Sequence, residues 1–198
     1  MFKPIAVLAF AAALATAIAT PAAAQSHSDD GAHFEFIINS GTLVPTGAQR
    51  DALARGPLTA AQLSYVIHPA VAITTSFGWA RSRDIADADS PKLDVFTYDA
   101  GAEVRAERWL SLGMLSVSPF AGAGAGGRSY NYRYREADAL HDLGVYGSAG
   151  GEIGIGSRLE LRLEARDFVT RFEALDGAGS VATRNDVSLM FGLRLRIL

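Results

Sequence analysis

The sequence predicts an all-β fold: an eight-stranded antiparallel up-and-down transmembrane β-barrel, preceded by a cleavable signal peptide. Three observations predict this fold. The chain begins with an export signal, most of the remaining sequence alternates between polar and apolar residues, and the connections between predicted strands alternate in length. Beyond the export signal there is no run of about 18 apolar residues, so a membrane location would require a closed barrel.

The export signal covers residues 1–24. Lys3 gives a positive start, residues 5–18 are mostly apolar, and three alanines ending at Ala24 form a cleavage site. The alternative is an N-terminal membrane anchor, but the apolar run of about 14 residues is shorter than the roughly 20 needed to span a bilayer. We expect residues 25–32 to form a flexible lead and residues 33–198 to form the outer-membrane β-barrel.

Composition narrows the location and the partners of the chain. It has 198 residues, 20 of them Gly and none of them Cys, and a formal net charge of −3. Without Lys3 the exported chain would carry −4, which argues against a nucleic-acid partner. The lack of cysteine excludes disulfides and a lipid-modified N-terminal cysteine. Export therefore leads to the periplasm, the outer membrane or the medium.

The clearest alternation lies in the last two predicted strands. Within 187–197, one parity holds Val187, Leu189, Phe191, Leu193, Leu195 and Ile197, and the other holds Ser188, Gly192, Arg194 and Arg196. Within 159–166, leucines and Ala165 alternate with Glu160, Arg162, Glu164 and Arg166. A helix would spread these side chains around its circumference, whereas a strand sends each set to one face.

Six further strands complete the predicted count of eight. The segments 34–38, 63–67, 71–79 and 96–104 alternate in the same way. The segments 117–132 and 143–155 are rich in glycine and less regular. Aromatic side chains near strand ends or at mid-height fit the girdles of a membrane barrel, although soluble sandwiches also carry aromatics: Tyr65, Trp79, Phe96, Tyr98, Trp109 and Phe168.

The connections favour a membrane barrel over a soluble one. Long connections at 44–57, 82–92, 133–142 and 173–184 alternate with tight links at 68–70 and 156–157 and an intermediate one at 107–113. Polar and apolar alternation alone also fits a soluble barrel or sandwich with an apolar core. Export, the alternating connections and a chain that ends within its last strand favour lipid outside, because pairing of the terminal strands removes both sheet edges.

Local motifs resemble the small eight-stranded outer-membrane β-barrel proteins of Gram-negative bacteria, the OmpA/OmpX-like porin superfamily. Residues 118–127 are similar to the Pro-aromatic-x-Gly-x-Gly strand of these proteins, and residues 162–168 are similar to their penultimate strand. The C-terminal strand resembles the signal read by the outer-membrane assembly machinery, although it ends on aliphatic rather than aromatic residues; its signal positions are Gly192, Leu195, Ile197 and Leu198.

Charged residues on the inward parity predict a lumen filled by ion pairs. An eight-stranded barrel has room inside only for side chains or one small ligand. The predicted lumen charge network consists of Glu35, Glu103, Arg105, Glu152, Glu160, Arg162, Glu164, Arg166, Arg194 and Arg196. Antiparallel counting sets Glu152 opposite Arg162, Glu160 near Arg196 and Arg162 near Arg194, with a slip of two residues possible.

The function expected from these features is non-enzymatic. We expect an outer-membrane protein that acts in envelope structure or in surface interaction through four extracellular loops, with membrane lipid, the assembly machinery and an unidentified extracellular partner as its contacts. The alternatives are a narrow pore and a soluble, lipocalin-like ligand carrier in the periplasm. A carrier of apolar ligands would need an apolar lumen and a polar exterior.

No catalytic, cofactor or metal site is predicted. Of four histidines, His27 lies beside serines in a polar lead and His141 lies beside Asp142 in a long connection, and neither forms a convincing Ser-His-acid arrangement. Three aspartates within 84–89 lack the turn glycine and terminal glutamate of a calcium loop. The glycines of 122–127 are not followed by the Lys-Ser/Thr of a phosphate loop.

Overall fold

A computed structural model describes residues 32–106, 110–112, 115–134, 140–155, 158–173 and 181–197. Eight long strands form the body of the molecule: β1 (His33–Thr46), β2 (Gly56–His68), β3 (Val71–Arg83), β4 (Lys92–Arg105), β6 (Leu115–Tyr132), β7 (Leu140–Gly154), β8 (Leu159–Glu173) and β9 (Val181–Ile197). A short strand β5 (Leu110–Leu112) and a 3-10 helix η1 (Gly47–Asp51) are added to them. The predicted signal peptide, residues 25–31 of the lead, Trp109 and Leu198 lie outside the described residues.

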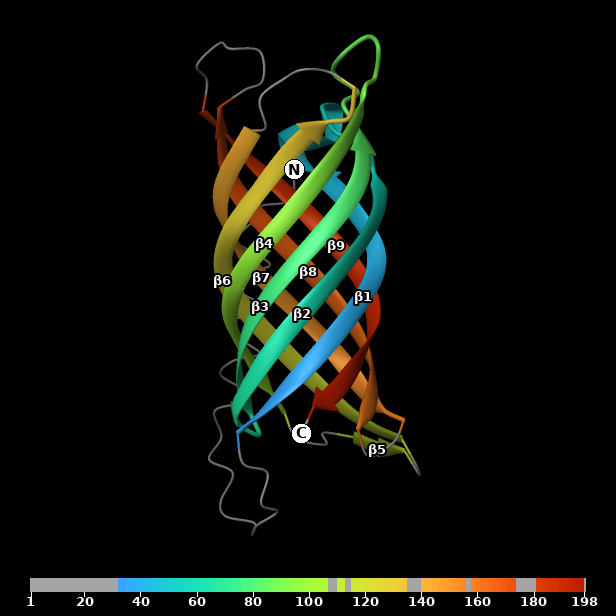
Figure 1. Cartoon of the computed structure of the whole chain (residues 1–198), viewed down its shortest axis with the longest axis vertical. Helices are drawn as coiled ribbons and strands as arrows, with labels where there is room; N and C mark the ends of the chain where they lie inside the picture. Colours follow the sequence, from blue (N-terminus) through green and yellow to red (C-terminus); the bar gives the residue numbers. More distant parts are fainter. Residues whose placement is uncertain are drawn as a thin grey trace.

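The sheet closes into a barrel of eight antiparallel strands. Each long strand pairs with its neighbours along the chain, except that β4 pairs with β6, because β5 makes only a short hairpin with β6. The first and last strands pair from Phe34 with Ile197 to Thr46 with Asn185. The strands cross the molecule at a tilt and enclose one lumen (Figure 1). The predicted eight-stranded antiparallel barrel is therefore confirmed.

The strands extend further than the sequence predicted, and the connections are shorter. β1 continues to Thr46 and β2 begins at Gly56, both within a predicted connection that ran from 44 to 57. Likewise β8 reaches Glu173 and β9 begins at Val181. Backbone groups at the rim still need partners, so pairing continues past the apolar alternation that guided the prediction.

The two ends of the barrel differ in their connections. At one end, where β1 begins and β9 ends, β2 is joined to β3 and β7 to β8 by short links, and the longer link from β4 to β6 contains β5; we refer to it as the turn end (Figure 1). At the other end lie the ends of β1, β3, β6 and β8 and the described connections 47–55 and 84–91, and we refer to it as the loop end. Among the described residues, no helix has both the length and the apolar character needed to cross a bilayer.

The apolar parity of the strands faces outward. Large exposed apolar side chains line the outer face, for example Ile38, Phe77, Leu163 and Phe191, all of which are more than half exposed. Phe168 is an exception among the aromatics expected in a girdle, because it is only 2% exposed and lies inside the lumen. Phe168 occupies an even position of β8, as Arg162 and Arg166 do, so strict alternation along the strand places all three side chains on the inner face.

Candidate functional site: the filled lumen

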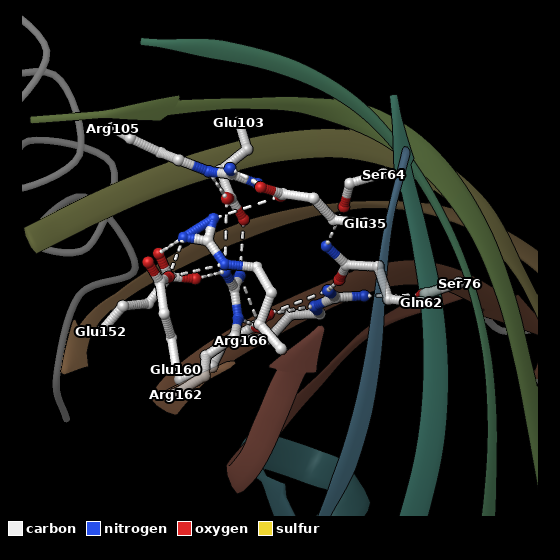
Figure 2. A network of polar contacts seen from close by, with 12 residues as sticks. Glu35, Gln62, Ser64, Ser76, Glu103, Arg105, Glu152, Glu160, Arg162 and Arg166 are labelled. Atoms are coloured by element: carbon white, nitrogen blue, oxygen red, sulfur yellow. Dashed lines mark hydrogen bonds and ion pairs between the residues drawn. The ribbon is translucent and has the colours of Figure 1, made fainter. Parts of the chain in front are cut away.

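Arg162 of β8 is the hub of a buried charge network near the turn end (Figure 2). Its guanidinium donates to three carboxylates, at 2.5 Å to Glu103 of β4, 2.5 Å to Glu152 of β7 and 3.0 Å to Glu164 of its own strand. None of these side chains is more than 4% exposed. Such charge-assisted bonds are strong where water is excluded, and each fixes both partners in position.

Two more arginines connect the network to β1. Arg105 donates to Glu103 at 2.6 Å and to Glu35 at 2.7 Å. Arg194 of β9 donates to Glu35 at 3.2 Å and to Glu160 at 2.9 Å, and it also bonds to Glu152. The carboxylates are therefore shared between arginines from β4, β8 and β9, so charge is balanced across the lumen rather than within isolated pairs.

Arg166 extends the network toward the loop end. It bonds to both carboxylate oxygens of Asp99 at 3.0 and 2.9 Å, and to Glu164 at 2.9 Å. It also donates to Gln62 of β2 at 3.2 Å and to Ser76 of β3 at 3.0 Å (Figure 2). These bonds join β8 to strands on other parts of the wall, and they occupy the middle of the barrel.

Aromatic rings lie beneath the arginines of the lumen. The guanidinium of Arg162 lies 3.5 Å from the ring centroid of Phe120, and that of Arg166 lies 4.5 Å from Tyr146. Glycines make room for these rings, because a Cβ at Gly124 would come within 2.6 Å of the Tyr146 ring. The glycine-rich sequence of β6 and β7 thus lets flat rings lie along the wall and support charged groups by cation–π attraction.

Toward the loop end the lumen becomes apolar on one side. A buried cluster, which we call the apolar plug, consists of Leu43, Leu53, Leu58, Ala80, Leu93, Val95, Tyr130 and Met190. Leu53 comes from the connection that follows η1 and is 5% exposed. This connection therefore folds over the mouth of the barrel and contributes to its filling. A cavity beside the plug is lined by Leu53, Leu93, Tyr130 and Arg184, among others.

A second, smaller polar cluster adjoins the apolar plug at the loop end. Arg128 of β6 forms a buried ion pair with Asp186 of β9 and lies 4.6 Å from the Phe168 ring centroid. Arg184 lies 3.8 Å from Asp142. Gln49 of η1 contacts the Tyr130 hydroxyl at 3.2 Å, so η1 is tied to the wall by polar contacts as well as by packing.

The structure brings the sequence-predicted lumen residues together near the turn end. Eight of them are buried: Glu35, Glu103, Arg105, Glu152, Arg162, Glu164, Arg166 and Arg194. Glu160 and Arg196 lie at the mouth, where they line a second cavity together with Arg158. Glu152 faces Arg162 in register as counted, but Glu160 faces Arg194 and Arg162 faces Gly192. The count between β8 and β9 was therefore wrong by two residues, the slip that barrel shear introduces.

Several lumen groups were missed by sequence reasoning. Asp99 stood on the inward parity of its strand, so a complete count would have included it. Arg128 was hidden because glycine and alanine on both parities obscure the alternation of β6. Arg184 stood in the predicted connection 173–184 and Asp186 preceded the alternation counted from Val187, although both belong to β9. The apolar plug was missed for the same reason, because Leu43, Leu58 and Leu93 lie near strand ends.

The predicted assembly signal lies on β9. Leu195 and Ile197 are exposed on the outer face, whereas Gly192 faces the lumen. A Cβ atom at Gly192 would collide with the side-chain amide oxygen of Asn39 and with the backbone carbonyl oxygen of Ile38. Glycine therefore allows the close packing of β9 against β1 at this position. Recognition of this strand by the assembly machinery stays a prediction.

The described residues do not gather a group of three or more His, Cys, Asp or Glu that could hold a metal ion. Asp142 is buried in the lumen, whereas the neighbouring His141 is exposed. The acidic segment at 84–89 is occupied by local bonds, because Asp84 accepts from the amide of Ala86 at 3.0 Å and from the hydroxyl of Tyr132 at 2.5 Å.

An up-and-down barrel with an apolar outer face and a charged, filled lumen defines a membrane-embedded barrel. The chain matches the model of the outer membrane protein beta-barrel domain family over residues 9–194, and it belongs to this family. Its location is accordingly the outer membrane. No curated protein sequence matches the chain at a significant level.

Solved structures show the same fold at low sequence identity. The neisserial surface protein A is 14% identical with a TM-score of 0.64, and the match covers 85% of this chain and 100% of that one. OprG of Pseudomonas aeruginosa is 11% identical with a TM-score of 0.52, covering 84% and 97% of the two chains. The barrel domain of OprF from the same species is 11% identical with a TM-score of 0.52, covering 85% and 100%.

Proposed function

We propose that the chain is a sealed, non-enzymatic outer-membrane barrel that serves envelope structure or surface interaction through its four long connections. The observation that carries the proposal is the filling of the lumen along its length. The charge network around Arg162 and Arg166 occupies the part near the turn end, and the apolar plug occupies the part near the loop end. An eight-stranded barrel has little cross-section to spare for a solute.

The alternatives are less well supported. A narrow pore would need a continuous path, but the cavity beside the plug and the cavity at the turn end lie on opposite sides of the Arg162 network. A soluble carrier would need a polar exterior, and this chain turns side chains such as Ile38 and Leu163 outward. The exterior therefore favours lipid as the surrounding medium.

Conductance tests the sealed barrel. We expect the protein, reconstituted in a planar bilayer, to give no steady conductance, because arginine–carboxylate bonds and close-packed apolar side chains cross the lumen. A general porin inserted under the same conditions is the positive control. Steady conductance of a size typical of general porins would contradict the proposal.

The proposed function also requires the loop end to face the outside of the cell. Trypsin applied to intact cells should then cut after the exposed residues Arg50 or Arg55 of the first connection, and spare the exposed Arg158 at the turn end. Lysed cells provide the control in which Arg158 becomes accessible. Cleavage of intact cells at Arg158 alone would mean that the orientation is inverted.

A further inference from the structure

Basic side chains gather on one sector of the outer face at the loop end. Four of them, Arg81 and Arg83 of β3, Lys92 of β4 and Arg133 directly after β6, define what we call the basic sector. Strand pairing places Arg83 beside Lys92, and the amide of Arg133 bonds to the carbonyl of Lys92 at 3.2 Å. The four residues are therefore neighbours across three adjacent strands.

Among the described strand residues, the outer face of β1, β2 and β9 near the loop end carries no basic side chain, and the outward position of β8 beside Val187 is the acidic Asp167. β1 and β9 pair there through Val44 with Val187 and Thr46 with Asn185, and Thr42 of β1 pairs with Pro57 of β2. A ring of charges that merely kept the rim in water would not need to concentrate on β3, β4 and β6. The uneven placement indicates a specific contact on that side.

Local contacts hold the basic sector in place. Arg81 lies 4.4 Å from the ring centroid of Trp79, whose indole nitrogen donates to Asp94 at 3.0 Å. Arg133 donates to the same carboxylate at 2.9 Å, and this hydrogen bond raises the pKa of the Arg133 guanidinium. Asp94 also faces Arg81 in the pairing of β3 with β4, while Arg81, Arg83 and Lys92 are exposed. Four cationic groups and this one carboxylate give the described residues of the cluster a net charge of +3, which favours an anion as the ligand.

Aromatic side chains lie directly below these cations on the outer face. Trp79 pairs with Phe96 across β3 and β4, and Phe77 stacks on Phe96 with ring centroids 6.1 Å apart. Aromatic girdles of membrane barrels lie at the boundary between hydrocarbon and headgroups. The cations of β3 and β4 stand one or two outward-facing positions further toward the loop end than Trp79 and Phe96. The basic sector therefore lies at the level of the headgroups of the surrounding leaflet.

We propose that the basic sector binds the phosphate groups of an anionic lipid in the leaflet around the loop end. Guanidinium groups bind phosphate through paired hydrogen bonds, and a lysine adds a compact charge. An outward-facing site at headgroup level meets lipid phosphates in a fixed layer, which favours a lipid over a soluble anion. The assignment of this leaflet to the outside rests on the proposed orientation of the barrel.

The test compares lipid binding by the wild-type chain and two charge-matched variants. The first is the triple variant Arg81→Gln, Arg83→Gln, Lys92→Gln, which leaves the bonded Arg133 in place. The matched control is Arg50→Gln, Arg158→Gln, Arg196→Gln, which removes the same charge from three positions away from the basic sector. Each folded protein, in phosphatidylcholine nanodiscs, is titrated with diphosphoryl lipid A, and a single Lys92→Gln variant is carried along in case the triple variant does not fold.

Each cationic group near an anionic surface contributes about fivefold to binding, so the triple variant should bind lipid A about 100-fold more weakly than wild type. The control should bind as wild type does, and Lys92→Gln should lose about fivefold. Unchanged binding by the triple variant, or an equal loss in the control, would overturn the proposal. Equal competition by inorganic phosphate would assign the site to a soluble anion instead and would also overturn it.

This binding experiment does not depend on the orientation of the barrel. Trypsin cleavage of intact cells tests the orientation alone, and bilayer conductance tests the seal alone. Failure of lipid A binding would therefore leave the sealed barrel standing, and failure of either of the other tests would leave the basic sector unaffected.

Discussion

Near the turn end, arginines and carboxylates are buried together in the lumen, whereas near the loop end the wall formed by β1 to β4 carries leucine, valine and alanine. Hydrogen-bonded ion pairs are directional, and here they join strands that are not neighbours in the sheet, as Arg162 of β8 does with Glu103 of β4. Apolar packing has no such direction. The charged half can therefore fix the relative positions of strands, while the apolar plug fills space.

The charge network and the apolar plug also differ in how they respond to a substitution. Loss of one member of a buried ion network leaves its partners charged and without water, whereas loss of an apolar side chain leaves a cavity. Buried ion pairs are not by themselves evidence of stability, because desolvation opposes their attraction. Substitutions that break one half at a time should separate these two effects.

The largest effect on stability is expected for Arg162→Leu. This change removes the donor shared by Glu103, Glu152 and Glu164, so it should lower the free energy of unfolding by about 3 to 5 kcal/mol. Urea unfolding from liposomes measures it. The matched control Arg158→Leu, at an exposed position, should change stability by less than about 0.5 kcal/mol. Equal effects of the two variants would contradict an inward-facing network.

A smaller loss is expected for Leu43→Ala in the apolar plug. Leu43 is 1% exposed, and truncation of a buried leucine costs about 2 to 4 kcal/mol through lost burial and the cavity left behind. The same unfolding measurement applies. Leu163→Ala on the lipid face is the control and should cost clearly less, because lipid chains can fill the space. If the control lost as much, the apolar plug would not be a packed core.

Much of the fold was predictable from the sequence because period-two alternation is strong in residues 159–166 of β8 and in β9, where leucine and charged residues share no parity. The same alternation identified Arg162 and its carboxylates as inward-facing before their partners were known. Pairing between distant strands, such as Arg105 with Glu35, could not be predicted, because it depends on the closure and shear of the barrel. The apolar plug was hidden because inward leucine reverses the rule that polar residues face the lumen.

The smallest effect is expected for the conductance of the single variants. The charge network and the apolar plug lie at different heights of one lumen, so they block ions in series, and opening either half leaves the other as a barrier. Arg162→Leu and Leu43→Ala should each remain as silent as wild type in planar bilayers. A combined variant, Arg162→Ser with Leu43→Ser and Leu93→Ser, should be the first to show ion leakage, because water could then enter from both ends and meet. Leakage through Arg162→Leu alone would mean that the apolar plug does not seal, and the sealing function would then belong to the charged half.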